Sequence, residues 1–283
     1  MTRLLAALVC VLLVATAGCA GIGGSDGQTT AAPTAPVDTA TETPTATESA
    51  AQLPAGVTTD GVEDAWALAD AHLAAVRNHS LVTYDRIRRT NASGAGLRNA
   101  TLAMTNESHW RYSLHGDGLS AVSDTDTDAY ETYADGERVL LRSENDSAVE
   151  YGAYTLRAEN ETVAVPPAQV FERSYRGRYG HSLVYTLASN ADDVEVLEDG
   201  EGAVRLPGTA DELSFGREET TNAEFTMTVA SDGQVTSIEM VYERENATVA
   251  RSVSFDTGVG DPVERPDWYG TALNETALNE SDA

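Results

Sequence analysis

Residues 130–142 read Tyr-Glu-Thr-Tyr-Ala-Asp-Gly-Glu-Arg-Val-Leu-Leu-Arg, two short runs that flank the dipeptide Asp135-Gly136. Asp-Gly suits the positive φ angles of a tight hairpin turn. The stretch therefore predicts two antiparallel strands, at 130–134 and 138–142. Further Asp-Gly pairs begin at Asp117, Asp199 and Asp232. The last two separate further strands that we expect at 194–197 and 203–206, and at 225–229 and 235–242.

Apolar residues elsewhere alternate with polar or small ones, which is the period of a strand with one buried face. One face of the segment 99–104 carries Ala100, Leu102 and Met104, and the other carries Asn99, Thr101 and Ala103. The pattern repeats at Trp110, Tyr112 and Leu114, and a last strand over 248–255 presents Val249, Val253 and Phe255. Short turns between such strands predict antiparallel meanders and not βαβ units.

Two segments carry helical signals. Asp60 is placed to cap a helix, and Glu63 follows three residues later, as in a capping box. The predicted helix ends near Arg77. One of its faces, which we expect to pack on the sheet, carries Val62, Trp66, Ala69, Leu73 and Val76. In mid-chain, Pro166-Pro167 introduces a second helical segment with Val170, Phe171, Tyr175, Leu183, Val184 and Leu187. The expected fold class is α+β: a curved antiparallel sheet, or half-open β-barrel, packed by an N-terminal helix and a mid-chain helical insertion.

The N-terminus carries an export signal. Arg3 precedes an apolar run from Leu4 to Ala17, and its 14 residues are too short a helix, at about 1.5 Å each, for a hydrocarbon layer roughly 30 Å thick. Ala17 and Gly18 place small residues before Cys19, which resembles a lipobox, where the thiol is alkylated by a lipid and the preceding bond is cut. We expect a lipid anchor at Cys19 on the outer face of the cytoplasmic membrane. The alternative is a secretory signal with an incidental Cys.

Composition divides the rest of the chain. Residues 1–18 are the expected signal peptide, and residues 19–55, rich in Thr, Ala and Pro, are expected to be a disordered tether. Residues 56–269 are long enough for one globular domain. Residues 270–283 are expected to be a disordered acidic tail.

With this order of elements, the chain resembles the LolA/LolB and LppX-type half-barrel superfamily of lipoprotein carriers, and the haloarchaeal surface lipoproteins of uncharacterised function that share that fold. The resemblance covers roughly residues 62–256. It rests on element order, the lipobox, and the hairpin Asp135-Gly136-Glu137-Arg138-Val139-Leu140. The resemblance implies an apolar cavity that is wrapped by the sheet, closed by helices and able to hold acyl chains.

The charge is strongly acidic. All 18 basic residues are Arg, Asp and Glu number 45, and the net charge is −27. Such a surface repels itself unless concentrated salt screens it, which is typical of a halophilic protein, and it argues against a nucleic-acid partner. Cys10 would be lost with the signal, so the mature chain would hold one Cys and no intramolecular disulfide.

Nine of the 11 Asn residues begin an Asn-x-Ser/Thr sequon, an excess that predicts a glycoprotein surface; an unused tripeptide is the alternative at any one site. The candidates are Asn78, Asn91, Asn99, Asn106, Asn145, Asn160, Asn246, Asn274 and Asn279.

Motifs for catalysis are missing. The sequence holds no nucleophile elbow, P-loop, paired Cys or His-Glu-x-x-His, and it predicts no catalytic residue, metal or cofactor. The acidic run 124–128 lacks the Gly and the bidentate Glu of an EF-hand, so we interpret it as a solvated turn. The adjacent carboxylates of Asp192-Asp193 and Glu218-Glu219 do not indicate an acid–base pair. Arg173, Arg176 and Arg178 could recognise a phosphate headgroup, with pairing to nearby carboxylates as the alternative.

These features predict a lipid-anchored, extracellular, non-catalytic protein that binds or carries an apolar ligand, a lipid or isoprenoid, in a half-barrel cavity. The alternative is an envelope structural or interaction lipoprotein whose concave face is filled by its own side chains. An extracellular hydrolase is a third class, opposed only by the missing motifs.

Overall fold

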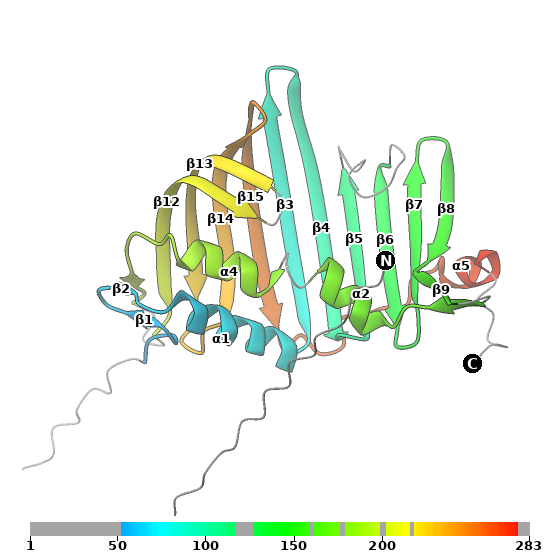
Figure 1. Ribbon diagram of the computed structural model, residues 1–283, viewed down its shortest axis with the longest axis horizontal. Coiled ribbons are helices and arrows are strands. Elements are labelled where there is room, and N and C mark those ends of the chain that lie inside the picture. Colours follow the sequence, from blue (N-terminus) through cyan, green and yellow to red (C-terminus); the bar gives the residue numbers. More distant parts are fainter. Residues whose placement is uncertain are drawn as a thin grey trace, which may run out of the picture. The chain divides into compact units, whose positions relative to one another are not determined.

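Eleven strands form one antiparallel sheet in the computed structural model, which describes residues 52–116, 127–158, 161–175, 179–198, 202–215 and 218–276. The sheet is curved and open, with β11 and β8 at its edges (Figure 1). In sheet order the strands are β11 (Glu195–Val196), β12 (Val204–Phe215), β13 (Glu218–Val229), β14 (Val235–Arg244), β15 (Ala247–Thr257), β3 (Leu81–Asn91), β4 (Gly94–Asn106), β5 (His109–Gly116), β6 (Ala129–Asp135), β7 (Val139–Asn145) and β8 (Ala148–Ala153). The α+β half-barrel fold class expected from the sequence is confirmed.

The Asp-Gly hairpin is confirmed between β6 and β7. Gly136 has a φ of 103°, and the Asp135 carboxylate accepts hydrogen bonds from the backbone N–H groups of Glu137 and Arg138, each at 2.9 Å. The turn at Asp232, where Gly233 has a φ of 88°, likewise joins β13 to β14. The pairs at Asp117 and Asp199 lie outside the described residues. Strand order along the sheet therefore follows the predicted meanders.

Strand β3 was not expected, and it holds the two halves of the sheet together. It pairs with β4 on one side and with β15, the last strand of the chain, on the other. Its buried face carries Leu81 and Thr83 but then Asp85, and this buried carboxylate interrupts the apolar alternation by which strands are recognised.

Helix α1 (Ala65–Asn78) begins later than the sequence suggests. Asp64, not Asp60, is the N-cap, and its Oδ1 accepts a hydrogen bond from the N–H of Ala67 at 3.0 Å. Asp60 lies in the turn of a small hairpin, β1 (Val57–Thr58) and β2 (Gly61–Val62). The predicted apolar face is wrong at Trp66, which is 58% exposed and packs its ring against His181 and Tyr185 at the surface. The sheet-facing positions begin at Leu68.

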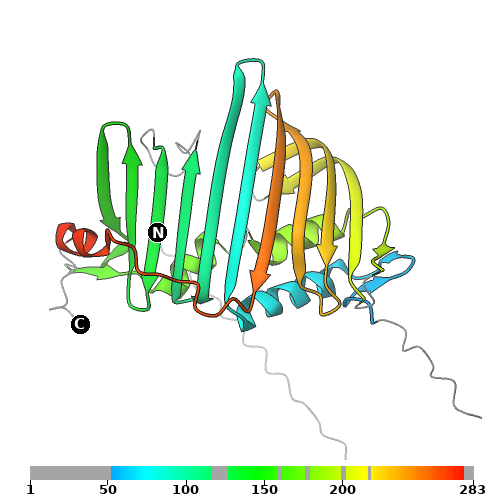
Figure 2. The same ribbon diagram turned by 180° about the vertical axis from the view of Figure 1, so that it is seen from behind.

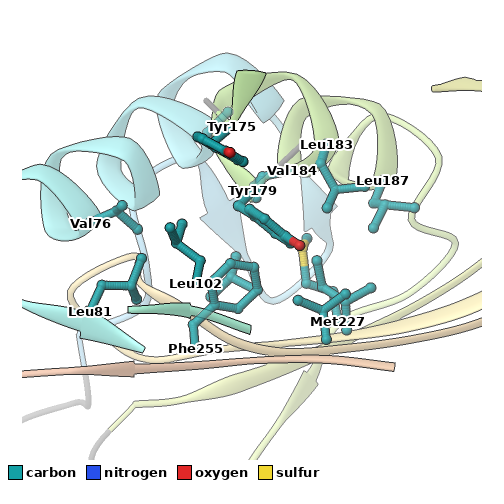
Figure 3. Close-up of a cluster of buried hydrophobic side chains, with 14 of the residues drawn as sticks. Val76, Leu81, Leu102, Tyr175, Tyr179, Leu183, Val184, Leu187, Met227 and Phe255 are labelled. Atoms are coloured by element: carbon teal, nitrogen blue, oxygen red, sulfur yellow. The ribbon is translucent and has the colours of Figure 1, made fainter. Parts of the chain in front are cut away.

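The mid-chain helices are confirmed as α2 (Pro167–Ser174) and α4 (His181–Ala188). Together with α1 they lie on one face of the sheet, here called the inner face (Figure 1). Leu183, Val184 and Leu187 of α4 point from the helix toward the sheet, where Met227 and Phe255 belong to the same core (Figure 3). The core therefore lies between these helices and the inner face.

The segment after β15 crosses the opposite face of the sheet, here called the outer face. It runs over the lower parts of β3 to β7 as they are drawn in Figure 2. It continues into α5 (Tyr269–Glu275), whose Ala272 is fully buried. The expected disordered tail from residue 270 is therefore wrong as far as residue 276. The reason is that Trp268 and Tyr269 bind distant acidic residues, Glu131 and Asp135, that no local pattern announces. Another hairpin, β9 (Thr155–Ala158) and β10 (Glu161–Ala164), precedes α2.

Candidate functional site

A narrow apolar cleft opens between α1, the inner face at β3 and β4, and the segment from α2 to Gly180. Its floor and walls are aliphatic and aromatic, with charged side chains only at the mouth. The lining residues are Leu73, Val76, Arg77, Leu81, Leu102, Met104, Glu107, Phe171, Tyr175, Tyr179 and Gly180. Figure 3 shows Tyr175 and Tyr179 between the helices and the sheet, near Leu102. This lining suits an apolar chain.

The cleft is closed down in this conformation. Its free volume is about 20 Å³, enough for about one water molecule. Sites that hold drug-sized ligands measure roughly 300–1,000 Å³. The cleft is therefore mostly filled by the protein's own side chains, and a ligand would need the helices to move apart.

Ion pairs of Arg77 bridge the mouth of the cleft. Its guanidinium lies 3.2 Å from Glu107 in the β4–β5 turn and 3.7 Å from Glu172 of α2. All three side chains are 40–45% exposed. Pairs this exposed contribute about 0–1 kcal/mol each. Arg77 thus links α1 to both opposite walls by contacts that are weak enough to open.

A buried ion pair lies deeper on the inner face, beneath Tyr179. Arg251 of β15 donates two hydrogen bonds to Asp85 of β3, at 2.9 and 2.8 Å, and the Tyr179 hydroxyl donates a third at 3.3 Å. Burial alone would lower the pKa of Arg251, but the Asp85 carboxylate outweighs it and raises that pKa above the usual range. The pair stays charged and fixes Tyr179 to the sheet.

His72 fixes the backbone of the same residue. Its Nδ1 accepts a hydrogen bond from the N–H of Val235 at 3.2 Å, so its Nε2–H donates to the Tyr179 carbonyl oxygen at 3.1 Å. Burial lowers the pKa of His72 to about 4, although the hydrogen bond to Tyr179 opposes this. A neutral His72 therefore joins α1, the segment before α4 and the first residue of β14.

Tyr175 forms the other wall of the cleft. Its hydroxyl shares a 2.8 Å hydrogen bond with Thr132 of β6, and its ring lies 4.8 Å from the rings of both Trp110 and Tyr112. Such aromatic contacts add rigidity beyond the burial of apolar area. The side of the cleft that Tyr175 lines is anchored to β5 and β6, whereas the side that Tyr179 lines is anchored to β3, β14 and β15.

The predicted basic patch is only partly described. Arg173 is exposed near the end of α2, and Arg176 and Arg178 lie outside the described residues. Asp124 and Asp126 of the acidic run also lie outside them. No group of three or more His, Cys, Asp and Glu residues within the described ranges is arranged to hold a metal ion.

The lipidation and glycosylation candidates stay predictions. Cys19, Asn160 and Asn279 lie outside the described residues, as do residues 1–51. Asn78, Asn91, Asn99, Asn106, Asn246 and Asn274 are exposed, and Asn145 is half-buried. Among the described residues, no helix is long and apolar enough to cross a bilayer.

The sequence patterns did not predict the residues that position the cleft. Asp85 and Arg251 are 166 residues apart, and His72 and Tyr179 are 107 apart. One signal could have pointed to two of them: Asp85 interrupts a strand pattern on its buried face, and Arg251 does the same between Val249 and Val253. A charged residue at a buried strand position calls for an opposite charge beside it.

The fold and the cleft define a small class: an open antiparallel half-barrel with helices across its inner face. No protein-family model matches the sequence, and no curated protein matches it. Among solved structures, it is similar to a DUF1329 family protein from Desulfovibrio piger, at 10% identity over 75% of this chain and 97% of that one, with a TM-score of 0.25. A LolA superfamily protein from Nitrosomonas europaea gives 10% identity, coverages of 72% and 95%, and a TM-score of 0.26. A domain from Vibrio parahaemolyticus, described as a putative outer membrane lipoprotein-sorting protein domain, is 9% identical over 73% of this chain and 96% of that one, with a TM-score of 0.23.

Proposed function

We propose that this protein binds the apolar chain of a lipid or isoprenoid, without catalysis, in the cleft between α1 and the side chains of Phe171, Tyr175 and Tyr179. The observation that carries the proposal is the cleft itself, which is apolar from Leu102 and Met104 on its floor to Phe171 on its wall. Transfer of each methylene from water into such a lining contributes about 0.8 kcal/mol. The ligand would be held by burial alone, because polar partners lie only at the mouth.

Entry requires α1 and α2 to separate. The exposed pairs of Arg77 with Glu107 and Glu172 oppose this separation weakly, and concentrated salt weakens them further. The buried contacts of Tyr179 would hold the far wall in place, so the opening would occur at the Arg77 end. We further propose that the domain works on the outer face of the cytoplasmic membrane, held by a lipid at Cys19 through the tether.

The second candidate is an envelope structural or interaction lipoprotein with a filled core. A specific observation favours it: the free volume of about 20 Å³. In that case α1 and α2 are permanent parts of the core, and no ligand enters.

Extraction of the full chain from a halophilic host, followed by mass spectrometry of the extracted lipids, separates the two candidates. A stoichiometric lipid supports binding. Its absence, together with no binding of a dansyl-labelled fatty acid, would leave the filled-core candidate.

A matched pair of variants places the ligand. Leu73→Trp puts a larger ring into the cleft and should weaken binding of the dansyl-labelled fatty acid at least tenfold, about 1.4 kcal/mol. Leu156→Trp makes the same change at a residue of β9 that is 52% exposed, and should leave binding unchanged. Equal binding by both variants would place the ligand elsewhere.

A further inference from the structure

The outer face of β14, β15 and β3 is not covered by any described helix: the C-terminal segment passes only the lower ends of β3 and β4 before it and α5 reach β5 to β8 (Figure 2). Tyr84 of β3 is 52% exposed on this bare face, and Val241 of β14 is 47% exposed. Between them lie the small outer-face residues of β15, Ala250, Ser252 and Ser254. The surface therefore carries a row of small side chains along β15 with larger side chains on both sides.

Basic charge gathers on one side of this row of small residues. Residues 86–106 contain four Arg and no acidic residue, in a chain of net charge −27. Arg86 and Arg88 alternate with buried-face residues, so both lie on the outer face, and both are exposed. Neither forms an ion pair with another described residue. Among the described residues they are therefore exposed cationic groups with no carboxylate partner.

Acidic charge gathers on the other side. Glu239 and Glu243 lie on the outer face of β14, and Glu239 is also without an ion pair among the described residues. The strand register puts Arg86, Ser252 and Glu239 in one row, because Ser252 pairs with Arg86 on one side and with Glu239 on the other. The next row holds Arg88, Ala250 and Val241.

This arrangement is self-complementary. Strands β3 and β14 flank β15 at the same spacing of about 4.8 Å, so a two-fold axis along β15 exchanges their positions. Two copies packed face to face about that axis bring Arg86 of each opposite Glu239 of the other. An isologous contact of this kind forms every pair twice.

We propose that the outer face of β14, β15 and β3 is a docking surface for a second copy of this chain. The strands from β13 to β4 at about 4.8 Å spacing, over rows 84–90 at about 3.3 Å per residue, cover roughly 550 Å² per copy. A standard interface buries about 800 Å² per partner. The dimer is therefore weak, with Tyr84 and Val241 contributing apolar area and the Arg86–Glu239 pairs setting the register.

The dimer also constrains glycosylation. Asn99 of β4 pairs with Arg86, so it lies in the same outer-face row, one strand further from the axis. A glycan at Asn99 would stand between the two copies. The dimer accordingly requires Asn99 to be unmodified, whereas Asn91 and Asn246 lie in or beside hairpin turns at the ends of the strands.

Sedimentation of the full chain tests the proposal, with Cys19→Ser so that an anchor cannot drive association. We expect a concentration-dependent dimer that Arg86→Glu and Glu239→Arg each weaken at least tenfold. The double variant should restore association, because both pairs then reform with exchanged charges. Arg89→Glu is the matched control: it makes the same change three residues along the same strand but on the inner face, beside Glu245, and should leave the dimer unchanged.

Three results would overturn the proposal: a monomer at all concentrations, a dimer that Arg86→Glu does not weaken, or a double variant as weak as the single ones. A dimer purified with a glycan on every Asn99, detected by mass spectrometry, would also overturn this geometry. None of these results bears on ligand binding in the cleft, which lies on the inner face.

Discussion

His72 and Tyr179 are joined by a buried hydrogen bond of 3.1 Å that links α1 to the segment preceding α4. The same imidazole accepts from the N–H of Val235 on β14. The bond from Val235 needs a neutral ring, because a protonated His has no acceptor nitrogen and would leave the Val235 N–H unpaired, whereas the bond to the Tyr179 carbonyl can form in either state. The protonation state of one residue therefore bears on the attachment of α1 to β14.

We predict that stability falls between pH 6.5 and about 4 because of His72. The folded-state pKa, about 4, is below the ordinary 6.5, so the stabilising neutral form is fully present above pH 6.5 and is lost as pH falls toward 4. The difference corresponds to about 3 kcal/mol. Urea unfolding at a series of pH values should show this loss in the parent chain and a shallower dependence in His72→Gln. His79→Gln, at an exposed site, should keep the parent's pH dependence; an equal slope in all three proteins would contradict the assignment.

We predict that Asp85→Ala lowers the free energy of unfolding by about 3–5 kcal/mol, because it leaves the buried Arg251 guanidinium without its carboxylate. The double variant Asp85→Leu/Arg251→Met removes both charges and should recover most of that loss. Denaturant unfolding of the parent, the single and the double variants measures both effects. A double variant no more stable than Asp85→Ala would show that packing around the pair, not the unpaired charge, dominates.

The sequence predicted the sheet and mid-chain helices well because their signals are local: Asp135-Gly136 makes its own turn, and Leu102 and Met104 alternate with smaller residues. The prediction failed where the local structure depends on a residue that is distant in the sequence. Asp60 and Asp64 are both competent caps, and the β1–β2 hairpin selects Asp64. The cleft could be expected only as a concave apolar face, since its closure depends on Arg77, whose partners Glu107 and Glu172 come from other elements.

We predict that Arg77→Ala speeds the entry of a dansyl-labelled fatty acid severalfold, because it removes both ion pairs across the mouth of the cleft. Its cost in stability should stay below about 1 kcal/mol, since these pairs are exposed. Stopped-flow fluorescence measures the rate. Arg205→Ala removes a comparably exposed ion pair, the one with Glu195, which joins β12 to the edge strand β11. This variant should leave the rate unchanged. Equal rates in the parent and Arg77→Ala would mean that entry occurs elsewhere or that no ligand enters.

Tyr269 tests whether the C-terminal segment is a permanent part of the domain. Its hydroxyl donates a 2.6 Å hydrogen bond to Asp135, the residue that forms the β6–β7 turn, and its ring lies against Tyr133 and Arg265. Burial raises the pKa of Tyr269 to about 12, and the Asp135 carboxylate adds to this. Burial would raise the pKa of Asp135, but the Tyr269 hydroxyl and the N–H groups of the turn outweigh it and lower that pKa below 3.8.

We therefore predict that Tyr269→Phe lowers the free energy of unfolding by about 1 kcal/mol at neutral pH, the contribution of one hydrogen bond to a charged group that is partly exposed. Because the folded-state pKa of Asp135 is lowered, this contribution is present above pH 3.8 and is lost as pH falls below it. The two proteins should thus converge in stability in acid. Tyr185→Phe, whose ring is 41% exposed on α4, should match the parent at every pH. A Tyr269→Phe variant with parental stability at pH 7 would mean that apolar packing alone, through Trp268 and Ala272, holds the segment on the sheet.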